Sequence, residues 1–181
     1  KKNICIPPRE DNIKNEKFML FPNAIDGPVC NNIRKCDEDI VLAVTRMDEH
    51  DHGKNIDKLL VAFSLVLNKN RNAKLKIIGD GVLKASLMEL AIKLKLEGSV
   101  LFLGRVSDGE LEIAYSEAKM FVLPSSKEGF GIVYLEAWKY GLPVICSKFG
   151  ASHEVVSHGV DGFVVDPDES DQLANYILKL F

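Results

Sequence analysis

Short apolar runs with the length of buried strands alternate with stretches of helical spacing from residue 38 to the end of the chain. The strand-like runs are Ile40–Thr45, Lys74–Ile78, Val100–Leu103, Met120–Leu123, Val144–Cys146 and Phe163–Val165. The helical stretches lie near residues 56–67, 83–94, 111–118, 133–140, 152–157 and 173–181. Apolar strands that alternate with helices are typical of a parallel sheet covered on both faces. The sequence therefore predicts an α/β fold with a doubly wound parallel sheet.

The first part of the chain does not follow this alternation. Residues 1–37 hold prolines, a charge-rich stretch and one short strand-like run, Phe18–Phe21. We therefore divide the 181 residues into a loop-rich linking segment (1–37) and one folded domain (38–181). A chain of this size buries roughly 70% of its unfolded surface, which is enough for an ordinary core.

Charge and cysteine usage narrow the class of protein. The formal net charge of −3 gives no basic footprint, so nucleic acid is not an expected partner. The four cysteines (Cys5, Cys30, Cys36 and Cys146) are scattered and form no C-x-x-C pair, which favours free thiols in a reducing compartment. No apolar run approaches the roughly 18 residues that span a membrane, and no signal peptide is recognisable. We expect a cytoplasmic location.

The most informative local feature is the turn after the apolar run Met120–Leu123. Residues 125–131 carry Glu128 and two glycines, and a helical stretch that contains Glu136 follows. In open α/β sheets, ligands bind outside the carboxyl ends of the strands. Glycines let the backbone approach a ligand, and the first N–H groups of a helix can hold a phosphate. Two carboxylates beside such a turn suit a ligand with a phosphate and hydroxyls on both sides of it, as in a nucleotide sugar.

At these residues the sequence resembles a known family. The segments Ser125–Gly131, Leu135–Ala137 and Gly141–Ile145 resemble the donor-binding signature of retaining glycosyltransferases of family 4 (glycosyl transferases group 1), which have the GT-B fold. Further motifs follow the family's order, namely Ile77–Gly81, Val100–Gly104, Gly150 with Glu154, and Gly159–Phe163. The resemblance covers roughly residues 38–181 and implies the C-terminal, donor-binding, Rossmann-like domain, one half of a GT-B fold.

The resemblance also implies roles for two cations. Arg46 ends the first strand, and Lys54 is expected to begin the first helix. In the family, an arginine and a lysine at these places neutralise the donor diphosphate. Between them, Asp48–Gly53 contains two histidines among acids, which we interpret as a solvated turn and not as a metal site. Asn55 stands where the family usually has glycine.

The remaining site residues follow the same resemblance. Glu128 would contact hydroxyls of the donor sugar, and Glu136 the hydroxyls of the ribose. Backbone N–H groups of Phe130, Gly131 and Ile132 would face the phosphate or the sugar. Two further positions are expected near the nucleotide, Gly79 in a tight turn and Val106 beside the base. For Gly79, a purely structural role in the turn is equally compatible with the sequence.

The resemblance implies a hexosyltransferase that moves a sugar, with retention, from a nucleotide-diphosphate donor to a glycan or lipid-linked acceptor. A missing N-terminal domain would hold the acceptor and make any peripheral contact with the inner face of the membrane. No cofactor or protein-bound metal is expected, and the fragment alone should be inactive. Two alternatives stay open: one half of a nucleotide-sugar epimerase, and a non-catalytic nucleotide-binding regulatory domain.

Overall fold

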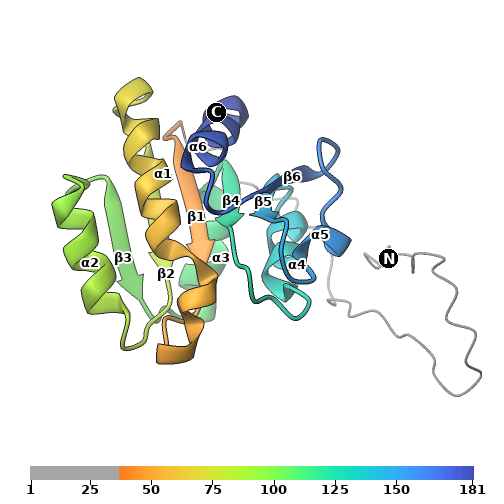
Figure 1. Cartoon of the computed structure of the whole chain (residues 1–181), viewed down its shortest axis with the longest axis horizontal. Helices are drawn as coiled ribbons and strands as arrows, with labels where there is room; N and C mark the ends of the chain where they lie inside the picture. The colour runs from red at the N-terminus through yellow and green to blue at the C-terminus, as the bar shows by residue number, and fades with distance from the viewer. Residues whose placement is uncertain (1–36) are drawn as a thin grey trace, which may run out of the picture.

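A computed structural model describes residues 37–181, and the predicted linking segment with its strand lies almost wholly outside this range. Six parallel strands form one sheet in the order β3-β2-β1-β4-β5-β6 (Figure 1). Their bounds are β1 Ile40–Val44, β2 Lys74–Ile78, β3 Val100–Gly104, β4 Met120–Leu123, β5 Val144–Ser147 and β6 Gly162–Val165. The sequence prediction of a parallel α/β sheet is therefore confirmed.

Helices cover both faces of the sheet. On one face α1 packs against α2 and α6, whereas α3 and α4 lie behind the sheet in the view of Figure 1, with α5 beside α4. The bounds are α1 Ile56–Lys69, α2 Lys84–Lys93, α3 Asp108–Glu117, α4 Ile132–Lys139, α5 Ser152–Val155 and α6 Ser170–Leu180, with a 3₁₀ helix, η1, at Glu49–Lys54. Among residues 37–181, no helix combines the length and apolar character needed to cross a bilayer.

The apolar character of the central strands places the core. Every residue of β4 and β5 is buried, as are four of the five residues of β1. The α1 helix turns an apolar stripe to the sheet through Leu59, Phe63 and Val66, all fully buried. Burying such side chains contributes about 1.5–3 kcal/mol each. The core therefore lies along the middle of the sheet, where it holds the ends of β1 and β4 in place.

The order of the strands reverses between β1 and β4. After β1 the chain moves outward through β2 to β3, and it then returns to place β4 on the other side of β1. In doubly wound sheets such a switch point leaves a crevice at the carboxyl ends of the strands. The two loops that border it are residues 45–55, after β1, and residues 124–131, after β4.

Candidate functional site

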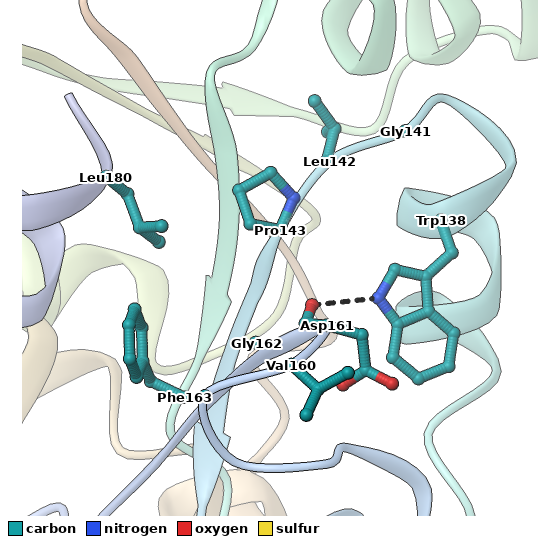
Figure 2. A pocket seen from close by; sticks show the side chains of 10 residues that line it. Trp138, Gly141, Leu142, Pro143, Val160, Asp161, Gly162, Phe163 and Leu180 are labelled. Carbon is teal, nitrogen blue, oxygen red and sulfur yellow. Dashed lines mark hydrogen bonds between the residues drawn. The ribbon is translucent and has the colours of Figure 1, made fainter.

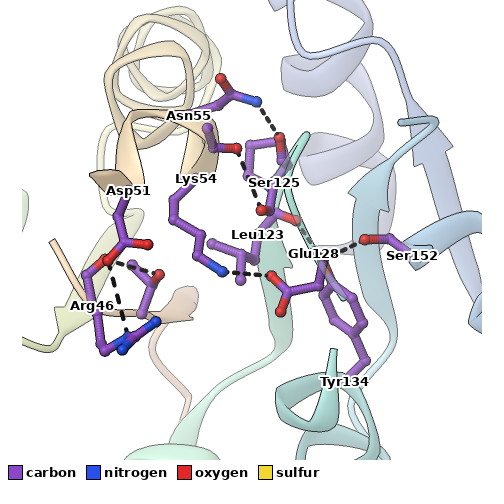
Figure 3. A network of polar contacts seen from close by, with 12 residues as sticks. Arg46, Asp51, Lys54, Asn55, Leu123, Ser125, Glu128, Tyr134 and Ser152 are labelled. Carbon is purple, nitrogen blue, oxygen red and sulfur yellow. Dashed lines mark hydrogen bonds and ion pairs between the residues drawn. The ribbon is translucent and has the colours of Figure 1, made fainter. Parts of the chain in front are cut away.

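An ion pair joins the two loops at the switch point. Lys54 Nζ lies 2.8 Å from Glu128 Oε2, and each side chain is only 15% exposed (Figure 3). The expectation that Lys54 begins a helix was wrong, because Lys54 ends η1 and α1 starts two residues later. The 3₁₀ turn is what directs the lysine across to Glu128. The structure thus brings together two of the predicted site residues that are 74 positions apart.

Asn55 occupies a position between η1 and α1 where glycine is not required. Its backbone adopts the left-handed conformation (φ 55°) between η1 and α1, which asparagine tolerates better than most residues. Its side-chain amide donates to the carbonyl of Pro124 and to Ser126 Oγ, both at 2.7 Å. In addition, the Ser126 N–H donates to the Gly53 carbonyl at 2.6 Å. These bonds fix the Lys54 loop against the Glu128 loop.

The backbone of Glu128 is held from a second side, by the loop after β5. The Ala151 N–H donates to the Glu128 carbonyl at 3.1 Å. Gly150 has φ +69°, and a Cβ there would lie 3.1 Å from the Glu128 nitrogen. The sequence motif includes Gly150 but gives no indication that Gly150 supports Glu128. A contact between loops 22 positions apart leaves no periodic signal in a sequence.

The start of α4 presents the predicted backbone groups. Gly131 is the N-cap residue with φ +80°, and a Cβ there would lie 2.3 Å from the ring of Tyr134. Tyr134 is itself fixed, because its hydroxyl donates to the Leu123 carbonyl at 3.0 Å and lies 3.2 Å from Ser152 Oγ. The N–H groups of the first helical turn have no partners within the helix. Ile132 is about half exposed, so this end of α4 opens to solvent.

Arg46 reaches the same region from the end of β1, but it is held loosely. Its side chain is 78% exposed, and its Nε lies 3.9 Å from Asp51 Oδ2. Arg46 and Lys54 both line a cavity of about 240 Å³ between η1, α1 and α2. A long and exposed arginine can reorient toward an anion, and its planar fork suits phosphate oxygens.

Glu136 lies one turn further along α4 and is partly buried. The hydroxyl of Tyr115, on α3, donates to Glu136 Oε2 at 2.9 Å. Burial raises the pKa of Tyr115 above its ordinary value, and the charge of Glu136 raises it further. Tyr115 therefore stays protonated and remains a donor at neutral pH. This partner was not foreseen, since the sequence places Tyr115 only in a helical apolar stripe.

The turn at Gly79 has a structural explanation of its own. Gly79 has φ +131°, and a Cβ there would lie 1.7 Å from the Thr45 carbonyl oxygen. Gly81 approaches the backbone of Met47 in the same way. Both glycines are required by the close passage of this turn beside the loop after β1. Val106, the predicted base contact, follows β3 and is half-buried against the core.

The acidic and histidine-rich loop before Lys54 forms η1. Asp51 Oδ2 accepts a hydrogen bond from the Asp48 N–H at 3.3 Å, which closes the first turn of this helix. Within residues 37–181, no cluster of three or more His, Cys, Asp and Glu side chains is placed to hold a metal ion.

A larger cavity lies elsewhere in the domain. It measures about 440 Å³ and is bordered by Pro143 and Gly162 at the amino-terminal ends of β5 and β6 (Figure 2). The Trp138 indole N–H donates across it to the Asp161 carbonyl at 3.3 Å. None of the predicted site residues lines this cavity, which is at the opposite edge of the sheet from the crevice.

Comparisons with known proteins assign the family. The family model described as glycosyl transferases group 1 matches residues 31–181, and the chain belongs to this family. It is 38% identical over 138 residues to an uncharacterized glycosyltransferase of Methanocaldococcus jannaschii, covering 76% of this chain and 34% of the relative. It is 38% identical over 128 residues to the O-antigen chain mannosyltransferase B of Escherichia coli, covering 70% and 33%.

A solved structure agrees with the fold and carries a ligand. Anabaena HepE, in complex with UDP and glucose, matches with a TM-score of 0.70 and 28% identity. The match covers 79% of this chain and 38% of HepE. This chain thus spans about a third of the length of the relatives it matches. Together with the six-stranded sheet, the match identifies the domain as one half of a GT-B glycosyltransferase.

Proposed function

We propose that this chain is the donor-binding half of a retaining glycosyltransferase of family 4. The observation that carries the proposal is the Lys54–Glu128 pair, which spans the switch point at 2.8 Å beside the start of α4. A cation, a carboxylate and the N–H groups that begin α4 meet where α/β sheets bind their ligands. The ligand is a nucleotide-diphosphate sugar.

The cations of the crevice contact the diphosphate of the donor, and the carboxylate of Glu128 contacts its sugar. Arg46 and Lys54 neutralise the diphosphate, together with the N–H groups of Phe130, Gly131 and Ile132. Glu128 then accepts hydrogen bonds from the sugar. Since Lys54 and Glu128 contact each other, each already holds the other toward the crevice.

The nucleoside lies along the other wall of the crevice. Glu136 accepts hydrogen bonds from the ribose hydroxyls, because a carboxylate has acceptor positions on both oxygens. Gly79 and Val106 border the base and the ribose. A half-buried carboxylate gives a stronger hydrogen bond than one in bulk water.

The chemistry follows from where charge develops. As the bond between the sugar and the diphosphate breaks, negative charge grows on the leaving phosphate oxygen. Arg46, Lys54 and the helix N–H groups stabilise that charge, which is electrostatic catalysis without a protein-bound metal. The acceptor, a glycan or a lipid-linked saccharide, binds to an N-terminal half in the cytoplasm, at the inner face of the membrane. This chain alone therefore binds donor without turning it over.

The test is a thermal-shift panel of the purified chain with UDP, GDP, ADP and their common sugar conjugates, without added metal. A ligand at about 100 times its dissociation constant adds roughly 2.7 kcal/mol to the free energy of unfolding. We expect one nucleotide class to raise the melting temperature. No shift with any of them would count against the proposal, as would a shift that requires a divalent cation.

A further inference from the structure

Glu136 is tied to a buried tyrosine on a neighbouring helix. Tyr115 is 2% exposed, and its ring stacks on Tyr140 at 5.3 Å and 9° between the planes. It also lies against Phe121 of β4, with ring centroids 6.0 Å apart. With the ring held on two sides, the hydroxyl has one fixed position. That position is 2.9 Å from Glu136 Oε2.

A glutamate on a helix normally samples several rotamers, and each one that is lost on binding costs affinity. The Tyr115 hydrogen bond selects one rotamer before any ligand arrives. A carboxylate offers about four acceptor positions, and the tyrosine takes one of them. The remaining positions suffice for two adjacent hydroxyls of a sugar ring.

We propose that Tyr115 is a positioning residue for nucleotide recognition, which holds Glu136 in the orientation that accepts the two ribose hydroxyls. This inference rests on the proposed function, because it takes Glu136 to be the ribose contact. Tyr115 does not touch the ligand itself. It acts only through the carboxylate, so its effect requires both Glu136 and the hydroxyls of the ribose.

The experiment compares a ribonucleoside diphosphate with its 2′,3′-dideoxy analogue, in calorimetric titrations of the wild-type chain and Tyr115→Phe. The pairs are UDP with dideoxy-UDP, GDP with dideoxy-GDP and ADP with dideoxy-ADP. Phenylalanine keeps the stacking on Tyr140 and Phe121 and removes only the hydroxyl. We expect binding of the ribonucleotide to weaken roughly 3- to 10-fold, the range for one hydrogen bond, and that of the dideoxy analogue to stay within 2-fold.

Tyr134→Phe is the matched control. Tyr134 is another buried tyrosine, and the partners of its hydroxyl within residues 37–181 are the Leu123 carbonyl and Ser152 Oγ, neither of which is a proposed ligand contact. Its loss should lower the melting temperature and leave the ratio of the two dissociation constants unchanged. In a Glu136→Ala background, Tyr115→Phe should have no further effect on this ratio.

The outcomes separate the two proposals. Equal weakening of both ligands by Tyr115→Phe, or no weakening of either, would overturn the positioning role and leave the donor site intact. Failure of the wild-type chain to bind any of the six nucleotides would overturn the proposed function and this inference with it. A ribonucleotide-specific loss would support both.

Discussion

Glu128 and Glu136 are separated by seven residues on the same loop and helix, yet they have different surroundings. Glu128 faces a lysine at 2.8 Å, whereas Glu136 accepts a hydrogen bond from a neutral tyrosine at 2.9 Å. In an ion pair the cation offsets the charge of the carboxylate, whereas a neutral hydrogen-bond donor orients the carboxylate without offsetting its charge. In the proposed site, Tyr115 orients the carboxylate of Glu136 toward the ribose hydroxyls, whereas Glu128 shares its charge with Lys54, the cation proposed to meet the phosphate.

Replacing Glu136 with alanine should weaken nucleotide binding by roughly 10- to 100-fold. The reason is that a hydrogen bond to a charged acceptor contributes about 1.5–3 kcal/mol. Titration calorimetry with the nucleotide selected by the thermal panel measures this directly. Glu154→Ala is the control, since it removes the same charge from an exposed position on α5. An unchanged affinity in Glu136→Ala would remove this residue from the site.

The Lys54–Glu128 pair should be energetically coupled in the folded domain. Each side chain is only 15% exposed, so removing one partner leaves the other charge poorly solvated. We expect Lys54→Met and Glu128→Gln each to lower the free energy of unfolding, and the double variant to lose about 1–3 kcal/mol less than the sum. Urea unfolding of the four proteins completes the cycle. Strict additivity would mean that the pair does not form in solution.

At the level of elements, Asn55 has two structural roles at the junction between η1 and α1. Asn55 supplies the left-handed turn that lets α1 start, and its amide ties that turn to the loop after β4. A glycine would supply only the turn. The family's usual glycine therefore gives the same backbone without the bridge between the two loops of the crevice.

Because the left-handed turn and the side-chain hydrogen bonds of Asn55 contribute separately, two variants of Asn55 should differ in stability. Asn55→Gly keeps the left-handed turn but loses both side-chain hydrogen bonds, which should cost about 1–3 kcal/mol because the bonds to Pro124 and Ser126 lie inside the domain. Asn55→Ala adds the strain of the left-handed conformation, about 1–2 kcal/mol more. Denaturant unfolding gives both values. If the glycine variant is as stable as wild type, the bridge contributes nothing.

The elements themselves were largely predictable from the sequence. Strands β2 and β4 have the predicted bounds, and the others differ by one residue at an end, because short runs rich in apolar residues and ended by polar residues, glycine or proline mark strands well. The 3₁₀ helix was expected as a solvated turn, and Lys54 was placed at a helix start. The six residues Glu49–Lys54 have no apolar periodicity, so the sequence gives no indication that they form a 3₁₀ helix.

The candidate site was predictable only in part. Motif order singled out Lys54 and Glu128, and the structure brings them into contact. It did not single out Tyr115 as a partner of Glu136, because that contact depends on how two helices are rotated against each other. Tyr115 and Glu136 are 21 positions apart and on different elements. Their pairing appears only when β1, β4 and the helices behind them are assembled.

For the domain as a whole, the packing around the central strands has a further consequence at high pH. Cys146 of β5 is fully buried, and burial raises the pKa of its thiol from 9.0 to about 12. Burial likewise raises the pKa values of Tyr115 and Tyr134 above 10.0. All three groups are neutral when protonated, so the core holds them in the form that needs no solvation.

The free energy of unfolding should therefore fall as the pH rises above about 9. The unfolded chain releases the Cys146 proton near pH 9.0, whereas the folded domain keeps it until about pH 12. Between these values the folded state binds more protons, so stability is complete below pH 9 and is lost at up to about 1.4 kcal/mol per pH unit for this group. Above pH 10 the two tyrosines add to the slope.

Urea unfolding at pH 8, 9 and 10 on wild type and Cys146→Ala isolates the thiol. Alanine changes the packing by a constant amount, so the two proteins share every other titration and only the difference between their curves matters. That difference should change little between pH 8 and pH 9, and between pH 9 and pH 10 it should change in favour of the alanine variant. Parallel curves across the whole range would show that the thiol ionises equally in both states. Such a result would mean that β5 opens to water far more readily than its burial between β4 and β6 implies.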